Sequence, residues 1–454
     1  MTGRFGPDST VPDMTGTWNR LNTARVLAAL LALTSTAVVA LRDVSVAPDG
    51  VSHETAVDEE EHEGRAPTEI ELTPSVEAAF RKESYAPGTT ARLVVWNRAG
   101  GLTVQLFRVG NAGRPTVGNV SMEGVAVTRK LPVGSSAGRL VVPIAIGDWP
   151  SGLYFARLDA KDGRAGFAPF VVRPAHPGTH QVAVVMPTLT WQSYNLRDDD
   201  RDGQGDSWYA RWKHHTVRLA RPFLNRGVPS NFRRYDLPFL EWLARTGREV
   251  EVLAQADVEA SNARELARSY DLIVFPGHHE YVTTREYDVI EGYRDLGGNM
   301  AFLSANNFFW QVVRHGDVME KTKQWRDLAR PEAALLGVQY RGNDRGEARA
   351  SWVVRDAPAV AWLFAGTHIR PGDLFGEDWG IEIDQTSSAS PRNVQVIAEL
   401  PDLFGPGFTA QMTYYETRGG AKVFAAGAFT LAGQAREPAV PRVLANLWAR
   451  LARP

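Results

Sequence analysis

The feature that most constrains the fold is a series of short apolar segments in the second half of the chain, alternating with helix-forming segments. The apolar segments are QVAVVMP (181–187), VEVLA (250–254), DLIVFP (271–276) and NMAFLSA (299–305). Between the first two, DLPFLEWLARTG (236–247) predicts a helix with Asp236 as its N-cap and Gly247 after its end. Buried strands that alternate with helices predict an α/β domain over residues 178–454, with a doubly wound, mainly parallel sheet.

Residues 68–174 show a different pattern, in which short β-like runs such as ARLVVWN and LTVQLFRV are separated by turn residues. This spacing predicts an antiparallel, immunoglobulin-like β-sandwich domain. The segment GSSAG (134–138) matches the G-x-S-x-G nucleophile elbow, but the strand-like RLVVPIAI follows it where that motif needs a helix. We therefore reject a serine hydrolase site there.

The N-terminal region predicts an export signal. Residues 26–41 form an apolar run that follows Arg20 and Arg25. We expect residues 1–45 to be a signal peptide or a membrane anchor and residues 46–67 to be a charged linker. The chain is then extracytoplasmic, either secreted or held at a membrane by its N-terminal segment.

Composition excludes several classes of site. The chain has no cysteine, which excludes disulfides, cysteine–zinc sites, iron–sulfur clusters and a cysteine nucleophile. Its formal net charge of −2 gives no electrostatic reason to bind nucleic acid. No HExxH motif is present, which removes the usual zincin helix.

Polar residues follow three of the apolar segments, where ligands bind in open α/β sheets. TWQSYN contributes Tyr194, GHHEY contributes His278, His279 and Glu280, and the third segment is followed by Asn306. Phenolate and carboxylate are hard donors that suit ferric iron, while imidazole would also accept zinc. Two other interpretations remain open at this point: general-base chemistry without a metal, and a hydrogen-bonded loop with no catalytic role.

These same segments resemble a known family, the C-terminal domain of the large (β) subunit of N,N-dimethylformamidase and its relatives. The resemblance lies in TWQSYN, DLPFLEWL, LFAGTHIRPGD, YYETRGGAKVFAAGA and, above all, the stretch from GHHEYV to NNFFWQ. DWPSGLYFARL and FVVRP are similar to the sandwich domain that precedes it, so the resemblance covers roughly residues 70–450.

The resemblance implies a class I glutamine-amidotransferase-like α/β domain that houses a mononuclear iron and hydrolyses small formamides, in an enzyme with an additional small subunit. The iron would be held by two tyrosines and a glutamate. Glu280 and Tyr194 match two of these ligands, and His278 and Asn306 take the supporting roles. The best match for the second tyrosine is Phe223, with Tyr209 as a substitute; if Phe223 is the true match, one phenolate is lost.

A second metal site is predicted in DDDRDGQGD (198–206). Alternating aspartates aim several hard oxygens at one point, and Gly203 allows the sharp turn that calcium loops need. The expected calcium ligands are Asp198, Asp200, Asp202, Gln204 and Asp206. Position twelve of the loop is Tyr209 rather than glutamate, so the loop is not an EF-hand.

The leading hypothesis is an exported, metal-assisted hydrolase of an amide or formamide-like C–N bond in a small-molecule substrate. Iron is the expected metal, with zinc as the alternative, and His278, His279 and Asn306 are the expected catalytic residues. The competing hypothesis is a non-enzymatic envelope protein that binds a ligand or carbohydrate at a degenerate site. A metal-free hydrolase with Glu280 as base is the third.

Overall fold

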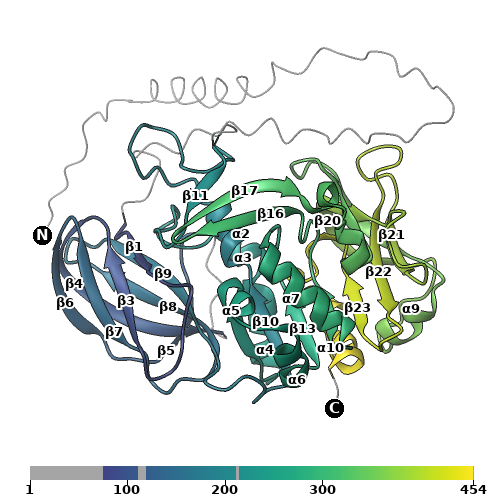
Figure 1. Cartoon of the computed structure of the whole chain (residues 1–454), viewed down its shortest axis with the longest axis horizontal. Helices are drawn as coiled ribbons and strands as arrows, with labels where there is room; N and C mark the ends of the chain where they lie inside the picture. Colours follow the sequence, from purple (N-terminus) through teal and green to yellow (C-terminus); the bar gives the residue numbers. More distant parts are fainter. Residues whose placement is uncertain (1–74, 111–118, 211–213, 453–454) are drawn as a thin grey trace, which may run out of the picture. The chain divides into compact units, whose positions relative to one another are not determined.

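The computed structural model describes residues 75–110, 119–210 and 214–452, and every structural statement below refers to them (Figure 1). Its N-terminal part contains two β-sheets. The three-stranded sheet has the order β1 (Ala78–Phe80), β3 (Thr90–Val95), β7 (Leu140–Ala145). The other has the order β2 (Ser84–Tyr85), β9 (Ala165–Val172), β8 (Gly152–Asp159), β4 (Arg98–Val109), β5 (Gly124–Ala126), and β6 (Leu131–Ala137) pairs with β4.

Side chains of both sheets meet in one apolar cluster, which includes Leu93 and Val95 of β3 and Tyr154 and Phe170 of the larger sheet. Alternation of inward and outward residues along each strand produces such a shared core. Two sheets that share one core support the predicted β-sandwich, although the pair β2–β9 is parallel; its immunoglobulin-like character stays a prediction. The segment GSSAG runs along β6 into the following turn, and strand β7 follows it.

The largest sheet is 11-stranded and mixed. Its order is β12 (Glu251–Ala254), β10 (Val182–Met186), β13 (Leu272–Phe275), β15 (Asn299–Phe302), β23 (Lys422–Ala425), β22 (Ala410–Glu416), β21 (Gln395–Leu400), β19 (Arg349–Val354), β20 (Leu374–Gln385), β18 (Gln339–Asn343), with β24 (Ala428–Phe429) paired to β20. The pairs from β12 to β23 are parallel. From β23 to β18, and between β20 and β24, all pairs are antiparallel.

The prediction of a doubly wound, mainly parallel sheet is thus wrong, and with it the expected glutamine-amidotransferase-like fold. The apolar segments of the sequence do form parallel neighbours. The error concerns residues 339–416, where long strands with mixed polar and apolar residues extend the same sheet in antiparallel fashion. Their half-exposed faces give no continuous apolar run, which is the pattern on which the prediction rested.

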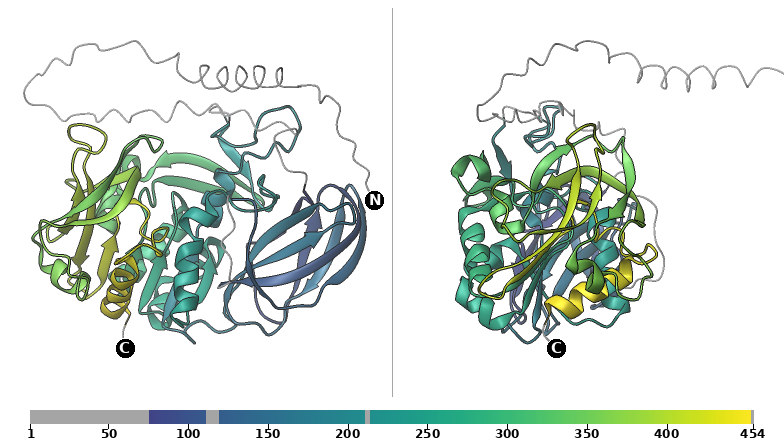
Figure 2. Two further views of the ribbon diagram at one scale, coloured as in Figure 1. Left: turned by 180° about the vertical axis from the view of Figure 1, so that it is seen from behind. Right: turned by 90° about the vertical axis from the view of Figure 1, so that its right-hand side faces the viewer.

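Helices cover both faces of the parallel strands (Figure 2). Along β10, Val182 and Val184 belong to one apolar cluster, while Ala183 and Val185 belong to another. Helices α4 and α10 contribute to the first cluster and α7 to the second. The helices are α2 (Thr188–Ser193), α3 (Phe232–Tyr235), α4 (Leu237–Arg245), α5 (Gln255–Ala260), α6 (Ala263–Ser269), α7 (Thr284–Asp295), α8 (Glu332–Leu336), α9 (Pro358–Leu363), α10 (Val440–Leu451) and the 3-10 helix η1 (Trp325–Leu328).

A separate four-stranded sheet has the order β11 (Thr216–Arg218), β17 (Val318–Gln324), β16 (Trp310–His315), β14 (Tyr281–Thr283). Figure 1 shows β16 and β17 as a long hairpin. Its apolar face packs with Leu189, Trp208 and Tyr281. The short strand β14 therefore connects this sheet to the carboxyl end of β13, where the candidate residues of GHHEY lie.

The predicted localisation finds no support and is withdrawn. The apolar run 26–41 and the linker 46–67 lie outside the described residues. Across the part of the chain that is described, no helix is long and apolar enough to cross a membrane.

The residue predicted to cap α4, Asp236, has a different role. It does occupy the N-cap position, but its side chain makes no capping hydrogen bond. Instead, its Oδ2 accepts a hydrogen bond from Trp191 Nε1 at 3.2 Å. Asp236 is 2% exposed. Burial raises the pKa of its carboxyl group to about 7, because the Trp191 hydrogen bond offsets only part of the desolvation.

This shift predicts how stability depends on pH. The folded state holds the Asp236 proton more tightly than the unfolded chain, in which the pKa is about 3.9. Protonated Asp236 therefore makes its full contribution to the free energy of unfolding below about pH 4, and this contribution is lost as the pH rises towards 7. Between pH 5 and pH 8 the free energy of unfolding should fall relative to that of Asp236→Asn, by at most roughly 1.4 kcal/mol per pH unit up to the folded pKa.

Urea unfolding of both proteins at pH 5 and pH 8 measures this difference. Asp317→Asn is a suitable control, because the Asp317 side chain is 70% exposed. The same pH dependence in wild type and Asp236→Asn would contradict the prediction.

Candidate functional site

The backbone after β13 is held in place from two sides. Gly277 lies against Asp236: a Cβ atom at position 277 would lie 2.1 Å from Asp236 Oδ1, so a larger residue would have to displace the Asp236 carboxyl group. Farther on, the Thr190 hydroxyl accepts hydrogen bonds from the backbone N–H groups of Glu280 at 3.1 Å and Tyr281 at 3.3 Å. These contacts bring Glu280 to the C-terminal end of α2, where Tyr194 is the C-cap residue.

Glu280 is the centre of a buried cluster of oxygen atoms. Its side chain is fully buried. Tyr194 donates its phenolic O–H to Glu280 Oε2 at 2.8 Å. The Tyr209 hydroxyl lies 2.9 Å from Oε2 and 3.1 Å from Oε1. The rings of Tyr194 and Tyr209 stack, with centroids 4.2 Å apart, so both phenol oxygens are presented to the same carboxylate.

The second phenol beside Glu280 belongs to Tyr209, and Phe223 lies elsewhere. Phe223 belongs to a large apolar cluster that also contains Trp191 and Phe232. Tyr209 reaches Glu280 because the loop after α2 folds back, with Ser207 Oγ donating to the Ser193 backbone carbonyl.

A third aromatic hydroxyl and a second carboxylate complete the surroundings. Tyr281 Oη lies 2.6 Å from Tyr209 Oη and accepts a hydrogen bond from Trp208 Nε1 at 3.0 Å. On the other side, His278 Nε2 lies 3.6 Å from Glu280 Oε2 and 3.4 Å from Glu382 Oε2. His278 thus lies between the two carboxylates.

Burial controls the protonation of these groups in the metal-free protein. Desolvation lowers the pKa of His278 to about 3, although a hydrogen bond with the Asn306 backbone opposes the shift. The imidazole is therefore neutral at neutral pH. Burial, followed by the negative charges of Glu280 and Glu382, raises the pKa of Tyr194 well above its usual value. A cation that approached this phenol would reverse that effect.

Asn306 lies where the sequence predicts it, and its backbone is strained. Its φ of +51° is in the left-handed region, which asparagine tolerates better than most residues. The Asn306 N–H donates to Asp384 Oδ1 at 2.8 Å, which holds this conformation. Asn306 Oδ1 is buried and, among the described residues, has no hydrogen-bond partner. It is therefore available to a ligand or water.

His279 points elsewhere. Its ring packs edge-on against Phe275 at 5.0 Å, and burial lowers its pKa well below the usual value. The structure therefore brings together Tyr194, Tyr209, His278 and Glu280, and places Asn306 beside His278. It does not bring the His279 side chain to Glu280 through any contact within the described residues.

The donor set fits a hard metal ion. Two phenol oxygens already lie within hydrogen-bond distance of one carboxylate, and replacing their protons with a cation needs no new residues. Phenolate and carboxylate oxygens favour ferric iron over softer metals.

Sequence reasoning missed three contributors: Tyr281, Glu382 and Asp384. Tyr281 is part of GHHEY itself. Glu382 and Asp384 lie two residues apart on β20, so their side chains share one face of the strand, where they reach His278 and Asn306 respectively. The segment GIEID carries no motif, and only the pairing of strands brings it to this site.

Comparison with known proteins identifies the family. The family described as N,N-dimethylformamidase beta subunit-like, C-terminal, matches residues 137–440. The chain belongs to this family. The match includes every residue of the cluster around Glu280.

Two curated relatives carry the description N,N-dimethylformamidase beta subunit. The protein from Alcaligenes sp. is 27% identical over 303 residues, which covers 54% of this chain and 39% of the relative. The protein from Paracoccus aminophilus is 29% identical over 140 residues, covering 30% of this chain and 18% of the relative. The matched regions therefore span less than half the length of these relatives.

Among solved structures, superoxide reductase (neelaredoxin) from Ignicoccus hospitalis is similar over 22% of this chain and 80% of its own. The identity is 12% and the TM-score 0.14, and this likeness carries no functional argument.

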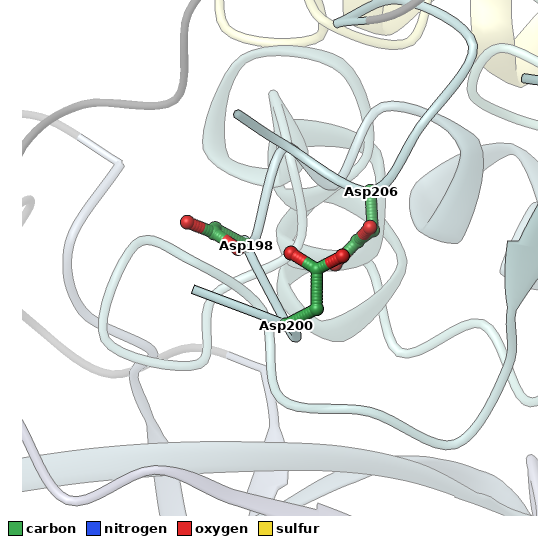
Figure 3. A group of neighbouring side chains, drawn as sticks. All are labelled: Asp198, Asp200 and Asp206. Atoms are coloured by element: carbon green, nitrogen blue, oxygen red, sulfur yellow. The ribbon is translucent and has the colours of Figure 1, made fainter. Parts of the chain in front are cut away.

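The predicted calcium loop lies just after Tyr194. Carboxylate oxygens of Asp198, Asp200 and Asp206 come within 4.8 Å of one another (Figure 3). Asp202 and Gln204 are not in this group; instead, Asp202 Oδ1 accepts a hydrogen bond from the Gln204 backbone N–H at 2.9 Å. Burial and then the charge of Asp200 raise the pKa of Asp206. The calcium site stays a prediction.

Calcium binding can be tested by thermal unfolding. If the loop binds calcium, the melting temperature should rise with added calcium and fall with excess EDTA, because a ligand that binds only the folded state stabilises it. Asp200→Asn should weaken this response. A melting temperature that calcium and EDTA both leave unchanged would contradict the prediction.

Proposed function

We propose that this protein is a metal-assisted hydrolase that cleaves the C–N bond of a small amide, with iron held by Tyr194, Tyr209 and Glu280. The convergence of two phenols on one buried carboxylate is the observation that carries the proposal. Membership of the N,N-dimethylformamidase beta subunit-like family supports the reaction class. Because each curated relative is covered only in part, the activity and substrate are inferred for this chain.

The metal, when bound, would polarise the amide carbonyl and lower the pKa of a water molecule. Iron fits this donor set better than zinc, because both phenolate and carboxylate are hard anionic oxygens. Tyr281 supports the set, since its hydroxyl lies 2.6 Å from that of Tyr209 and helps to orient it.

His278 and Glu382 are placed to move the proton. Hydrolysis adds water across the amide: the water oxygen bonds to the carbonyl carbon, the C–N bond breaks, and the amine leaves with a proton. In this proposal the Glu382 carboxylate accepts the proton of the attacking water and returns it to the leaving nitrogen. The neutral ring of His278 lies beside this carboxylate, with its Nε2 3.4 Å from Glu382 Oε2.

We expect the side chains next to His278 to contact a small substrate. The Asn306 side chain can donate an amide hydrogen to a carbonyl oxygen or accept a hydrogen bond from water. Next to His278 lies Phe429, with ring centroids 4.8 Å apart, and Phe429 forms a small apolar cluster with Tyr235 and Ala305. These side chains would contact the apolar substituents of an amide.

Neither alternative hypothesis gains support from the geometry. A degenerate binding site was favoured by the loss of the second tyrosine, but Tyr209 contacts Glu280. A metal-free mechanism needs Glu280 as an available base, whereas both phenols hydrogen-bond to its carboxylate.

Metal content tests the ligand assignment directly. The wild-type protein should hold iron after gel filtration, and Glu280→Ala and Tyr209→Phe should hold far less, because each loses an anionic ligand. Elemental analysis of the three proteins measures this. Phe223→Leu serves as the control, since Phe223 lies in the apolar core, and it should retain wild-type iron.

Two results would overturn this assignment. Wild-type protein that takes up neither iron nor zinc would reject the metal site. Equal metal content in wild type and Glu280→Ala would reject Glu280 as a ligand.

Glu382→Gln separates proton transfer from metal binding. It should keep the iron content of the wild type while kcat for release of amine from a small formamide falls about 10²–10⁴-fold, the usual range for loss of a general base. Asp317→Asn, which changes an exposed carboxylate, is the matched control. An unchanged kcat in Glu382→Gln would rule out the proposed role.

A further inference from the structure

The β-sandwich contributes one carboxylate to the support of the site. Glu83 lies in the turn between β1 and β2, and its side chain is 17% exposed. Its Oε2 accepts a hydrogen bond from Thr188 Oγ1 at 2.5 Å, and its Oε1 accepts one from Arg314 Nη2 at 2.5 Å. The backbone N–H of Ala256 lies 3.4 Å from Oε2. One side chain of the sandwich thus contacts three separate elements of the other domain.

The contact between Glu83 and Thr188 connects the sandwich to the helix that ends at Tyr194. Thr188 is the first residue of α2, and Tyr194 caps the other end of that helix. Pro187 at the N-cap position provides no side-chain hydrogen bond, and Glu83 contacts this end of the helix through the Thr188 hydroxyl. A six-residue helix is about 9 Å long and moves as a unit, so a displacement at Thr188 reaches the Tyr194 phenol.

The contact between Glu83 and Arg314 connects the sandwich to strand β16, which pairs with the strand that follows Glu280. Arg314 of β16 also lies 3.4 Å from Glu259, and Glu259 Oε1 accepts a hydrogen bond from Thr283 Oγ1 at 3.1 Å. Thr283 ends β14, three residues after Glu280, and β14 pairs with β16. Burial lowers the pKa of Arg314, but the charges of Glu83 and Glu259 outweigh it and keep the guanidinium charged.

Gln255 connects helix α2, which precedes Tyr194, with strand β14, which follows Glu280. Its side-chain carbonyl accepts a hydrogen bond from the Leu189 backbone N–H at 2.8 Å, and its amide donates to the Tyr281 carbonyl at 2.8 Å. The Gln255 backbone N–H lies 3.4 Å from Thr188 Oγ1, beside the Glu83 contact. The elements that carry Tyr194 and Glu280 are therefore cross-linked in the same region that Glu83 anchors.

We propose that Glu83 is a positioning residue for the metal site, which sets the spacing between Tyr194 and Glu280 through Thr188 and Arg314. The inference rests on the proposed metal site. It assigns the β-sandwich a part in the reaction: residues remote from a metal can tune its binding by orienting the ligands.

The test compares Glu83→Ala with Glu83→Gln in the full chain. Glu83→Ala should weaken iron binding roughly 10–100-fold, the usual effect of removing a group that orients a ligand. It should also change the visible absorption from tyrosinate-to-iron charge transfer. Glu83→Gln keeps an oxygen that can accept from Thr188 and should restore part of the affinity.

Ser151→Ala is the matched control. Ser151 also belongs to the sandwich and hydrogen-bonds to the other domain, but through the Val252 backbone on β12. This variant should leave iron affinity and the absorption spectrum unchanged. Wild-type affinity and spectrum in Glu83→Ala would overturn the proposal.

A measurement on the metal-free protein separates the role of Glu83 from the metal assignment. Hydrogen exchange of the metal-free protein should be faster at residues 188–194 and 280–283 in Glu83→Ala, but not in Ser151→Ala. Failure of the wild type to bind iron would reject the proposed function, whereas unchanged exchange in these segments would reject the role of Glu83.

A double-mutant cycle covers the case in which Glu83→Ala does not fold. Glu83→Gln and Thr188→Val, alone and combined, should show non-additive effects on hydrogen exchange at 188–194, because they break the same contact. Additive effects would contradict a direct link between the two residues.

Discussion

The buried carboxylate of Glu280 is the constraint on which the rest of the site depends. A fully buried charge is costly unless hydrogen bonds or a cation compensate it. Here the compensation comes from the phenols of Tyr194 and Tyr209, and Thr190 fixes the backbone by accepting the N–H of Glu280. Thr190 and Tyr194 belong to α2 and its C-cap, Tyr209 lies in the loop after that helix, and Glu280 follows β13, so the site forms only when these three segments are packed together.

The mixed sheet explains how the remaining groups reach this carboxylate. The parallel strands place His278 and Asn306 near one edge, as the carboxyl ends of parallel strands do. The antiparallel strand β20 then adds Glu382 and Asp384 from one face. Burial raises the pKa of Asp384 to about 7, despite the hydrogen bond from the Asn306 N–H. Asp384 therefore helps to hold Asn306 in its strained conformation, because it accepts the hydrogen bond from the Asn306 N–H.

Much of the fold followed from local patterns. Strands β10 and β13 are predicted because their residues are apolar on both faces. Helix α7 begins after Thr283, whose Oγ1 accepts a hydrogen bond from the Glu286 N–H, while the Glu286 carboxylate accepts one from the Gln255 side chain. The antiparallel half of the sheet was missed, because half-exposed strands with polar residues resemble loops in sequence.

By itself the sequence predicted an oxygen-rich site at Tyr194 and Glu280, because polar residues follow the strand ends there, and the family resemblance implied their role as metal ligands. For the third ligand, the second tyrosine of the family, the sequence offered Phe223 as the best match and Tyr209 as a substitute. Only the tertiary structure shows that Tyr209 contacts Glu280, that the His279 ring packs against Phe275, and that Glu382 and Glu83 lie near the elements of the site. The physical reason is that a side chain's partners far along the chain, such as Glu280 for Tyr209, depend on how strands pair and loops fold back, which local sequence does not encode.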